Sequence, residues 1–143
     1  EGLPEPPEAV HPGSGQLLRA GTDLVIVACG VMAGPALEAA ADLEADGKSV
    51  AVFDPVWLKP APETELIRLA VGCGAVLIAE DGAARGGFGE YVSALLASGH
   101  PGVRTAVAAV PDSFQPHAVR GRLLASAGLD RQGLAASARR LLA

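Results

Sequence analysis

Short apolar runs in this chain alternate with segments whose apolar residues recur at helical spacing. The run Ala75–Ala79 is wholly apolar, which is typical of a strand buried on both faces of a sheet. A glycine-rich stretch, Gly82–Gly89, follows it. The next apolar residues lie on one face of a helix: Tyr91, Val92, Leu95 and Leu96. A strand, a glycine loop and a helix in this order form half of a parallel crossover unit.

The same pattern predicts three more buried strands and four more helices. The strands are Leu24–Cys29, Ser49–Phe53 and Gly102–Val110. Each helix is identified by the apolar residues on its inward face. These are Ala36, Ala40 and Leu43 in the first helix; Leu66, Ile67, Ala70 and Val71 in the second, Glu63–Val71; Val119, Leu123, Leu124 and Ala127 in the third of these; and Leu134, Ala138, Leu141 and Leu142 in the last. Asp130 precedes the last helix and is predicted to cap it.

A fifth strand, Gln16–Arg19, precedes the turn Gly21–Asp23, and we expect it to form a hairpin with the run that follows. Strands that alternate with helices indicate an α/β fold with right-handed crossovers. The sequence therefore predicts a three-layer sandwich around a five-stranded, mainly parallel sheet. Its one antiparallel strand, Gln16–Arg19, would lie at the edge.

The length of 143 residues fits one domain. Residues 1–14 are proline-rich and are predicted to be a linker or docking strap, which leaves 15–143 as the domain. The net charge of -5 argues against a nucleic-acid partner, and no apolar run reaches the roughly 18 residues of a membrane span. Cys29 and Cys73 lie in or beside apolar runs, so we expect two buried free thiols in a cytoplasmic protein.

Candidate chemistry gathers after the Ala75–Ala79 strand. Glu80 and Asp81 are adjacent and therefore point in different directions, so a capping role is favoured over a catalytic pair. The loop Gly86–Gly89, with Arg85 before it, has two interpretations. Its amides either hold an anion, or its glycines permit a tight turn and close packing.

Four other positions belong to the candidate set: Trp57, Lys59, Tyr91 and His117. Trp57 follows a strand and is expected to cover the end of the sheet. Trp57, Phe88 and Tyr91 are expected to gather at one rim as a protein interface. His117 is expected to cap the helix that follows it. Substitution of Gly87 by Val is expected to harm folding more than Glu80→Gln, with water replacing the partner that Glu80 loses.

Several motifs occur in the order and spacing found in one known family. They are Gly30 followed by Ala36–Ala40, Lys59-Pro60, Glu80-Asp81 and Gly86-Gly87-Phe88-Gly89. The chain resembles the C-terminal domain of the transketolase superfamily. Its tail, Pro111–His117 and Gly128–Asp130, is most similar to that of the 1-deoxy-D-xylulose-5-phosphate synthases. Val56 and Ala61-Pro62 depart from the family pattern, in which Val56 is usually arginine or another polar residue.

The resemblance implies the function of the whole enzyme. Such enzymes use thiamine diphosphate and Mg²⁺ to join pyruvate to glyceraldehyde 3-phosphate, with loss of carbon dioxide, and feed isoprenoid and thiamine biosynthesis. Those groups bind to upstream domains, so the resemblance implies no catalytic residue and no cofactor on this chain. It implies instead an assembly domain that contacts the upstream domains within a homodimer.

Two alternatives remain open from the sequence. The first is the C-terminal domain of a 2-oxoacid dehydrogenase beta subunit, which shares the Glu-Asp and Gly-Gly-x-Gly motifs; the tail after Val110 argues against it. The second is a stand-alone module that binds an anion or another small molecule at the glycine loop.

Overall fold

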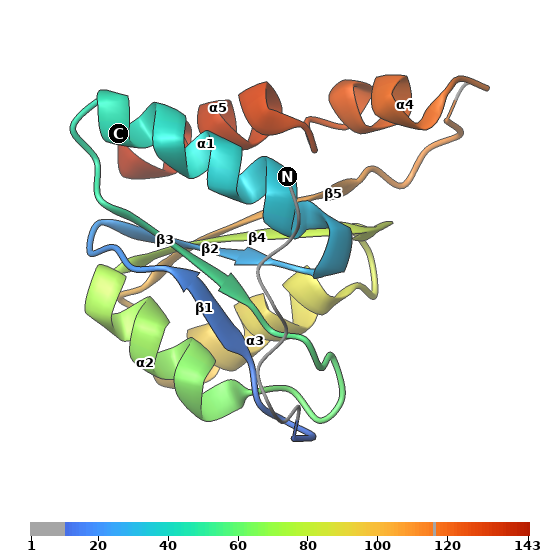
Figure 1. Cartoon of the computed structure of the whole chain (residues 1–143). Coiled ribbons are helices and arrows are strands. Elements are labelled where there is room, and N and C mark those ends of the chain that lie inside the picture. Colours follow the sequence, from blue (N-terminus) through green and yellow to red (C-terminus); the bar gives the residue numbers. More distant parts are fainter. Residues whose placement is uncertain (1–10, 116) are drawn as a thin grey trace.

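A computed structural model describes residues 11–115 and 117–143, and in it five strands form one sheet (Figure 1). The spatial order is β1-β3-β2-β4-β5. Strands β2 to β5 are mutually parallel, and β1 runs antiparallel to β3 at one edge, as predicted. Their bounds are β1 (Gln16–Arg19), β2 (Leu24–Ala28), β3 (Val50–Asp54), β4 (Ala75–Ala83) and β5 (Arg104–Val110).

Helices cover both faces of the sheet. In Figure 1, α1 and α5 lie above the sheet and α2 and α3 below it, so the predicted three layers are confirmed. The bounds are η1 (Gly30–Met32), α1 (Ala33–Ala45), α2 (Glu63–Cys73), α3 (Phe88–Gly99), α4 (Arg120–Ser126) and α5 (Arg131–Leu142).

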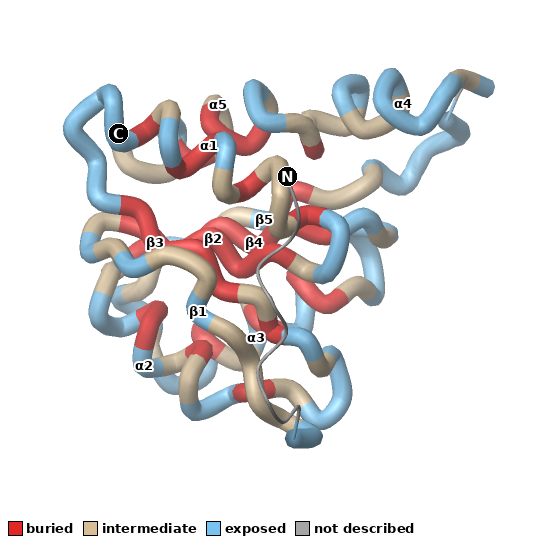
Figure 2. Tube along the Cα trace, in the orientation of Figure 1, coloured by how far each residue is buried: buried red, intermediate tan, exposed pale blue. Residues whose placement is uncertain are grey.

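The central strand β2 shows how the sequence builds two cores. All five of its residues are buried, and Figure 2 shows the buried positions concentrated in the sheet. Because side chains alternate along a strand, Leu24 and Ile26 pack with α1 and α5, while Val25 and Val27 pack with α2 and α3. A continuous apolar run is what a strand covered on both faces requires.

The structure corrects one predicted strand pairing, one strand boundary and the inward face of one helix. Strand β1 pairs with β3 and not with β2, so the predicted hairpin is wrong. Strand β4 continues to Ala83 and includes Glu80 and Asp81, which were expected to follow it. Val71 is exposed, because Leu69 and not Val71 completes the inward face of α2.

The C-terminal third also differs from the prediction in its burial. Strand β5 lies at the edge of the sheet, so only Ala108 of it is buried. Helix α4 buries none of its residues, and Val119 before it is largely exposed. Cys29 and Cys73 are free thiols, as expected, but they are half-buried and not fully enclosed.

Polar contacts tie the last helix to the domain. The Asp130 side chain accepts a hydrogen bond from the amide of Gly133 at 2.8 Å, which confirms the predicted cap. Arg131 of α5 pairs with Asp42 of α1 at 2.7 Å, and Arg139 pairs with Asp46 at 2.8 Å. The Arg131 guanidinium holds the pKa of Asp42 below its usual range.

Two remaining expectations concern the N-terminus and membranes. Most of the predicted linker, residues 1–10, lies outside the described residues. Among the residues that are described, no helix is both long and apolar enough to cross a membrane.

The Asp130 cap generates a stability prediction. Asp130→Ala should lower the free energy of unfolding by about 1 kcal/mol, because the Gly133 amide loses its acceptor. Urea unfolding followed by circular dichroism measures this. Asp112→Ala, which removes a carboxylate from an exposed surface ion pair with Arg85, is the control and should change stability by less than about 0.5 kcal/mol. Equal effects of the two substitutions would contradict the cap.

Candidate functional site

The candidate residues gather at one end of the sheet, where β2, β3 and β4 have their carboxyl ends. We call this end the carboxyl edge; it is distinct from the edge strands β1 and β5. The segment after β2 begins with Gly30, the segment after β3 follows Asp54, and β4 carries Glu80 near its end. Parallel strands place their carboxyl ends side by side, which is where ligands and partners bind to open parallel sheets. The antiparallel β1 begins at this same edge, since Gln16 pairs with Asp54.

Glu80 and Asp81 point to opposite faces of the sheet, as their adjacency predicts. Glu80 continues the side of β4 that carries Val76 and Ile78, which packs with α3. Asp81 lies toward the other side, where its carboxylate accepts a hydrogen bond from Arg120 of α4. The two acids therefore serve different layers and do not form a catalytic pair.

The Glu80 carboxylate fixes the start of α3. It is only 6% exposed, and its two oxygens accept hydrogen bonds from the amides of Phe88 and Gly89 at 2.9 and 2.8 Å. These amides are among the first four of the helix, which have no partner within the helix itself. The predicted capping role is confirmed, but the expectation that water could replace the partner of Glu80 is wrong at this burial.

The loop before α3 has the shape that its glycines allow. Gly86 has a φ of +70°, and its amide donates to the Glu90 carboxylate at 2.6 Å. At Gly87 a Cβ atom would lie 2.3 Å from the carbonyl oxygen of Ala83. Close packing therefore explains Gly87, while Gly89 belongs to α3 and not to the loop.

These contacts decide what the glycine loop can hold. The α3 amides that would bind a phosphate already donate to Glu80, so the residues present do not fit the diphosphate of thiamine diphosphate. Within residues 11–115 and 117–143, no group of three or more His, Cys, Asp and Glu side chains could hold a metal ion. We derive no chemical step through either group on this chain.

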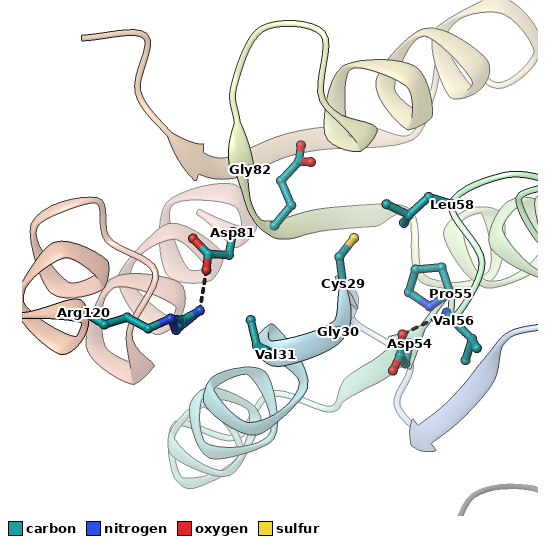
Figure 3. A pocket seen from close by; sticks show the side chains of 11 residues that line it. Cys29, Gly30, Val31, Asp54, Pro55, Val56, Leu58, Asp81, Gly82 and Arg120 are labelled. Carbon is teal, nitrogen blue, oxygen red and sulfur yellow. Dashed lines mark hydrogen bonds and ion pairs between the residues drawn. The ribbon is translucent and has the colours of Figure 1, made fainter. Parts of the chain in front are cut away.

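A first hollow, of about 540 Å³, lies at the carboxyl ends of β2, β3 and β4 (Figure 3). The chain crosses from β3 to β4 on the other side of β2 here, which makes this a switch point of the sheet. Figure 3 shows Cys29 and Leu58 on one side of the hollow and the Asp81–Arg120 pair on the other. Burial, with Glu80 and Asp54 nearby, raises the pKa of the Cys29 thiol to about 12. Cys29 is therefore a protonated thiol and a poor nucleophile at neutral pH.

A second hollow, of about 600 Å³, lies between the Lys59 turn and the start of α3. Lys59, Gly86, Gly87, Phe88 and Tyr91 all line it, so the structure brings these five candidates together. The ring centroids of Phe88 and Tyr91 are 5.9 Å apart. The Tyr91 hydroxyl donates to the Glu63 carboxylate, which raises the pKa of the tyrosine.

Among the other candidates, Phe88 and His117 lie differently from the expectation. Phe88 is 7% exposed and packs in the core, so it is not available at a rim; it begins a helix whose inward face it completes. Trp57 is half-buried. His117 is exposed, and the residue at the N-cap of α4 is Val119, so His117 does not cap the helix. Arg85 is exposed and pairs with Asp112 at 3.5 Å.

Sequence reasoning missed two residues of the edge. Arg120 lies 39 positions from Asp81, and nothing in the local sequence signals their pairing. Val56 has a φ of +56°, which is rare for a β-branched residue, and its amide donates to the Asp54 side chain at 2.9 Å. The turn-forming pair Asp54-Pro55 indicates a loop at this point of the sequence but does not give its conformation.

Comparison with known proteins agrees with the fold. The family model for the transketolase C-terminal domain matches residues 13–134, so the chain belongs to that family. A solved structure described as a split gene transketolase, inactive beta4 tetramer, superposes with a TM-score of 0.87 at 35% identity. The match covers 93% of this chain and 43% of that chain.

Curated relatives carry a more specific name. 1-deoxy-D-xylulose-5-phosphate synthase of Syntrophotalea carbinolica is 40% identical over 140 residues, covering 98% of this chain and 22% of the relative. The enzyme of that name from Magnetococcus marinus is 38% identical over 142 residues, 97% of this chain and 23% of the relative. The chain thus spans about a fifth of the length of these relatives and matches a domain of each.

Removal of one Glu80 oxygen as an acceptor should weaken the fold. Glu80→Gln leaves one of the Phe88 and Gly89 amides facing an amide NH₂ group inside the protein, at a cost of about 1.5–3 kcal/mol in unfolding free energy. Urea titration of the purified variant measures the loss. Glu90→Gln alters an exposed acceptor in the same loop and is the matched control, with an expected loss below about 1 kcal/mol.

Gly87 should tolerate no side chain. Gly87→Ala brings a Cβ atom against the Ala83 carbonyl oxygen and should cost about 1–3 kcal/mol, an effect similar to that of Glu80→Gln. Gly99→Ala, at the open end of α3, should be neutral or stabilising by up to about 1 kcal/mol. Thermal unfolding of both variants distinguishes them, and a stable Gly87→Ala protein would refute the close packing.

Proposed function

We propose that this chain is the C-terminal domain of a thiamine-diphosphate-dependent 1-deoxy-D-xylulose-5-phosphate synthase in the cytoplasm. In this proposal the enzyme joins pyruvate to glyceraldehyde 3-phosphate with release of carbon dioxide, for isoprenoid and thiamine precursor synthesis. Thiamine diphosphate and Mg²⁺ bind to upstream domains of the same protein. The names of the relatives, matched over 97–98% of this chain in the two described, support the assignment.

The domain's own contribution is assembly, and the distribution of exposed apolar side chains carries this proposal. Val31, Val56, Phe114 and Val119 are large and at least 43% exposed, and all four lie in the segments that follow β2, β3 and β5 at the carboxyl edge. Exposed apolar side chains gathered on one side of a domain mark a protein interface. We assign this edge to contact with the upstream domains within a homodimer.

The structure and the comparisons favour this function over the two alternatives. The tail after Val110 separated the synthase from a 2-oxoacid dehydrogenase beta subunit, and the match to Syntrophotalea carbinolica synthase covers 98% of the chain. An anion module at the glycine loop is disfavoured, since Glu80 already occupies the helix amides.

A chimera tests the assignment. Residues 1–143 replace the matching segment of the Syntrophotalea carbinolica synthase, which is 40% identical over that length. The chimera should form product from pyruvate and glyceraldehyde 3-phosphate when thiamine diphosphate and Mg²⁺ are supplied, whereas the 143-residue chain alone should not. A folded, dimeric but inactive chimera would contradict the synthase assignment.

The assembly role is tested in the same chimera with a matched pair of valines. Val31→Ser changes a 62% exposed side chain at the carboxyl edge, and Val71→Ser changes a 51% exposed side chain near the end of α2. Val31→Ser should weaken the dimer at least about tenfold, equivalent to roughly 1.4 kcal/mol, while Val71→Ser should not. Sedimentation velocity measures both dissociation constants, and equal constants would place the interface elsewhere.

A further inference from the structure

The chain enters the domain beside the second hollow. Because β1 is antiparallel to β3, the residues before it lie at the carboxyl edge. A Cβ atom on Gly13 would lie 3.5 Å from Pro60, and the Gly15 amide donates to Glu65 at 3.1 Å. The Ser14 amide donates to the carbonyl of His11 at 3.0 Å, so a turn reverses the chain where its described part begins. Residues 1–10 therefore start within reach of the hollow.

The hollow offers apolar surface and one cation. Leu58 is 53% exposed and Tyr91 41% exposed, and Pro60 lies on the same rim. Lys59 is exposed, and among the described residues it takes part in no ion pair. Glu63, the acid in the lining, accepts the hydrogen bond of the Tyr91 hydroxyl. An occupant with apolar groups and a carboxylate matches this lining.

Residues 1–10 have that chemistry. The segment Leu3-Pro4-Glu5-Pro6-Pro7-Glu8 combines four apolar residues with two carboxylates, and residues 1–10 contain no Lys or Arg. Proline-rich segments favour the extended polyproline II conformation and dock on aromatic-lined grooves at a low entropic cost. Glu8 lies four positions before Pro12, a stretch that spans up to roughly 14 Å, enough to reach a hollow whose rim residue Pro60 lies beside Gly13.

We propose that residues Leu3–Glu8 of this chain bind in the second hollow. The prolines cover Tyr91 and Leu58, and the Glu5 and Glu8 carboxylates lie opposite Lys59. Binding covers exposed apolar surface and fixes the direction of the N-terminal segment on the domain. This inference goes beyond the proposed function and holds whatever reaction the whole protein performs.

Hydrogen exchange of the full chain, followed by mass spectrometry, tests the docking. Substitution of Leu3, Pro4, Pro6 and Pro7 by Ser should speed exchange in residues 56–61 and 84–91 about threefold or more, because covered amides exchange only when the segment leaves. Exchange in α5, which packs on the opposite face of the sheet from α3, should stay unchanged. Equal exchange in the two proteins at residues 56–61 and 84–91 would overturn the proposal.

A charge exchange tests the contact with Lys59. Lys59→Glu should speed exchange at the hollow as the Ser variant does, and Glu5→Lys with Glu8→Lys in the Lys59→Glu protein should restore protection. Lys48→Glu alters the chain's other lysine, which is exposed and lies beside Asp46 and Arg139 at a different hollow, and should have no effect. Protection that rises with protein concentration over a hundredfold range would identify a second copy as the occupant. That result would overturn this proposal and would leave the chimera's test of the proposed function unaffected.

Discussion

The Glu80 carboxylate, enclosed near the end of β4, is the constraint on which the carboxyl edge depends. A buried carboxylate is costly unless hydrogen bonds compensate it, and here the Phe88 and Gly89 amides do so. That requirement fixes where α3 begins and brings the loop so close to β4 that Gly87 has no room for a side chain. One acid therefore determines a helix start, a loop shape and a glycine position together.

Side chains alternate between the two faces of β4, so its adjacent acidic residues reach both helical layers. Glu80 holds α3 on one face, and its neighbour Asp81 holds Arg120 of α4 on the other. Helix α4 buries none of its own residues, so this ion pair is one of its ties to the domain. The Asp81–Arg120 pair thus joins β4 to α4, which are adjacent in space although the two residues are 39 positions apart in sequence. The edge is consequently built from both faces of the sheet.

What the sequence predicted follows from interactions that are local or periodic. The apolar run at Ala75–Ala79, the opposite directions of Glu80 and Asp81, and the Asp130 cap depend only on neighbours along the chain. The errors concern tertiary pairing. Nothing in Gln16–Arg19 says which strand it will join, and β5 has a buried-strand composition although it lies at the edge. Phe88 was assigned to a rim because the sequence does not show how deeply α3 packs.

Val56 lies in the turn after β3 and has a backbone conformation that is unusual for its residue type. A β-branched residue at a φ of +56° costs about 1–3 kcal/mol in backbone strain and persists only where the surroundings dictate the conformation. Here the Asp54 side chain accepts a hydrogen bond from the Val56 amide. Leu58 and Lys59 follow closely in the chain and line the second hollow. The backbone of this turn, and not the Val56 side chain, positions Leu58 and Lys59 in the wall of that hollow.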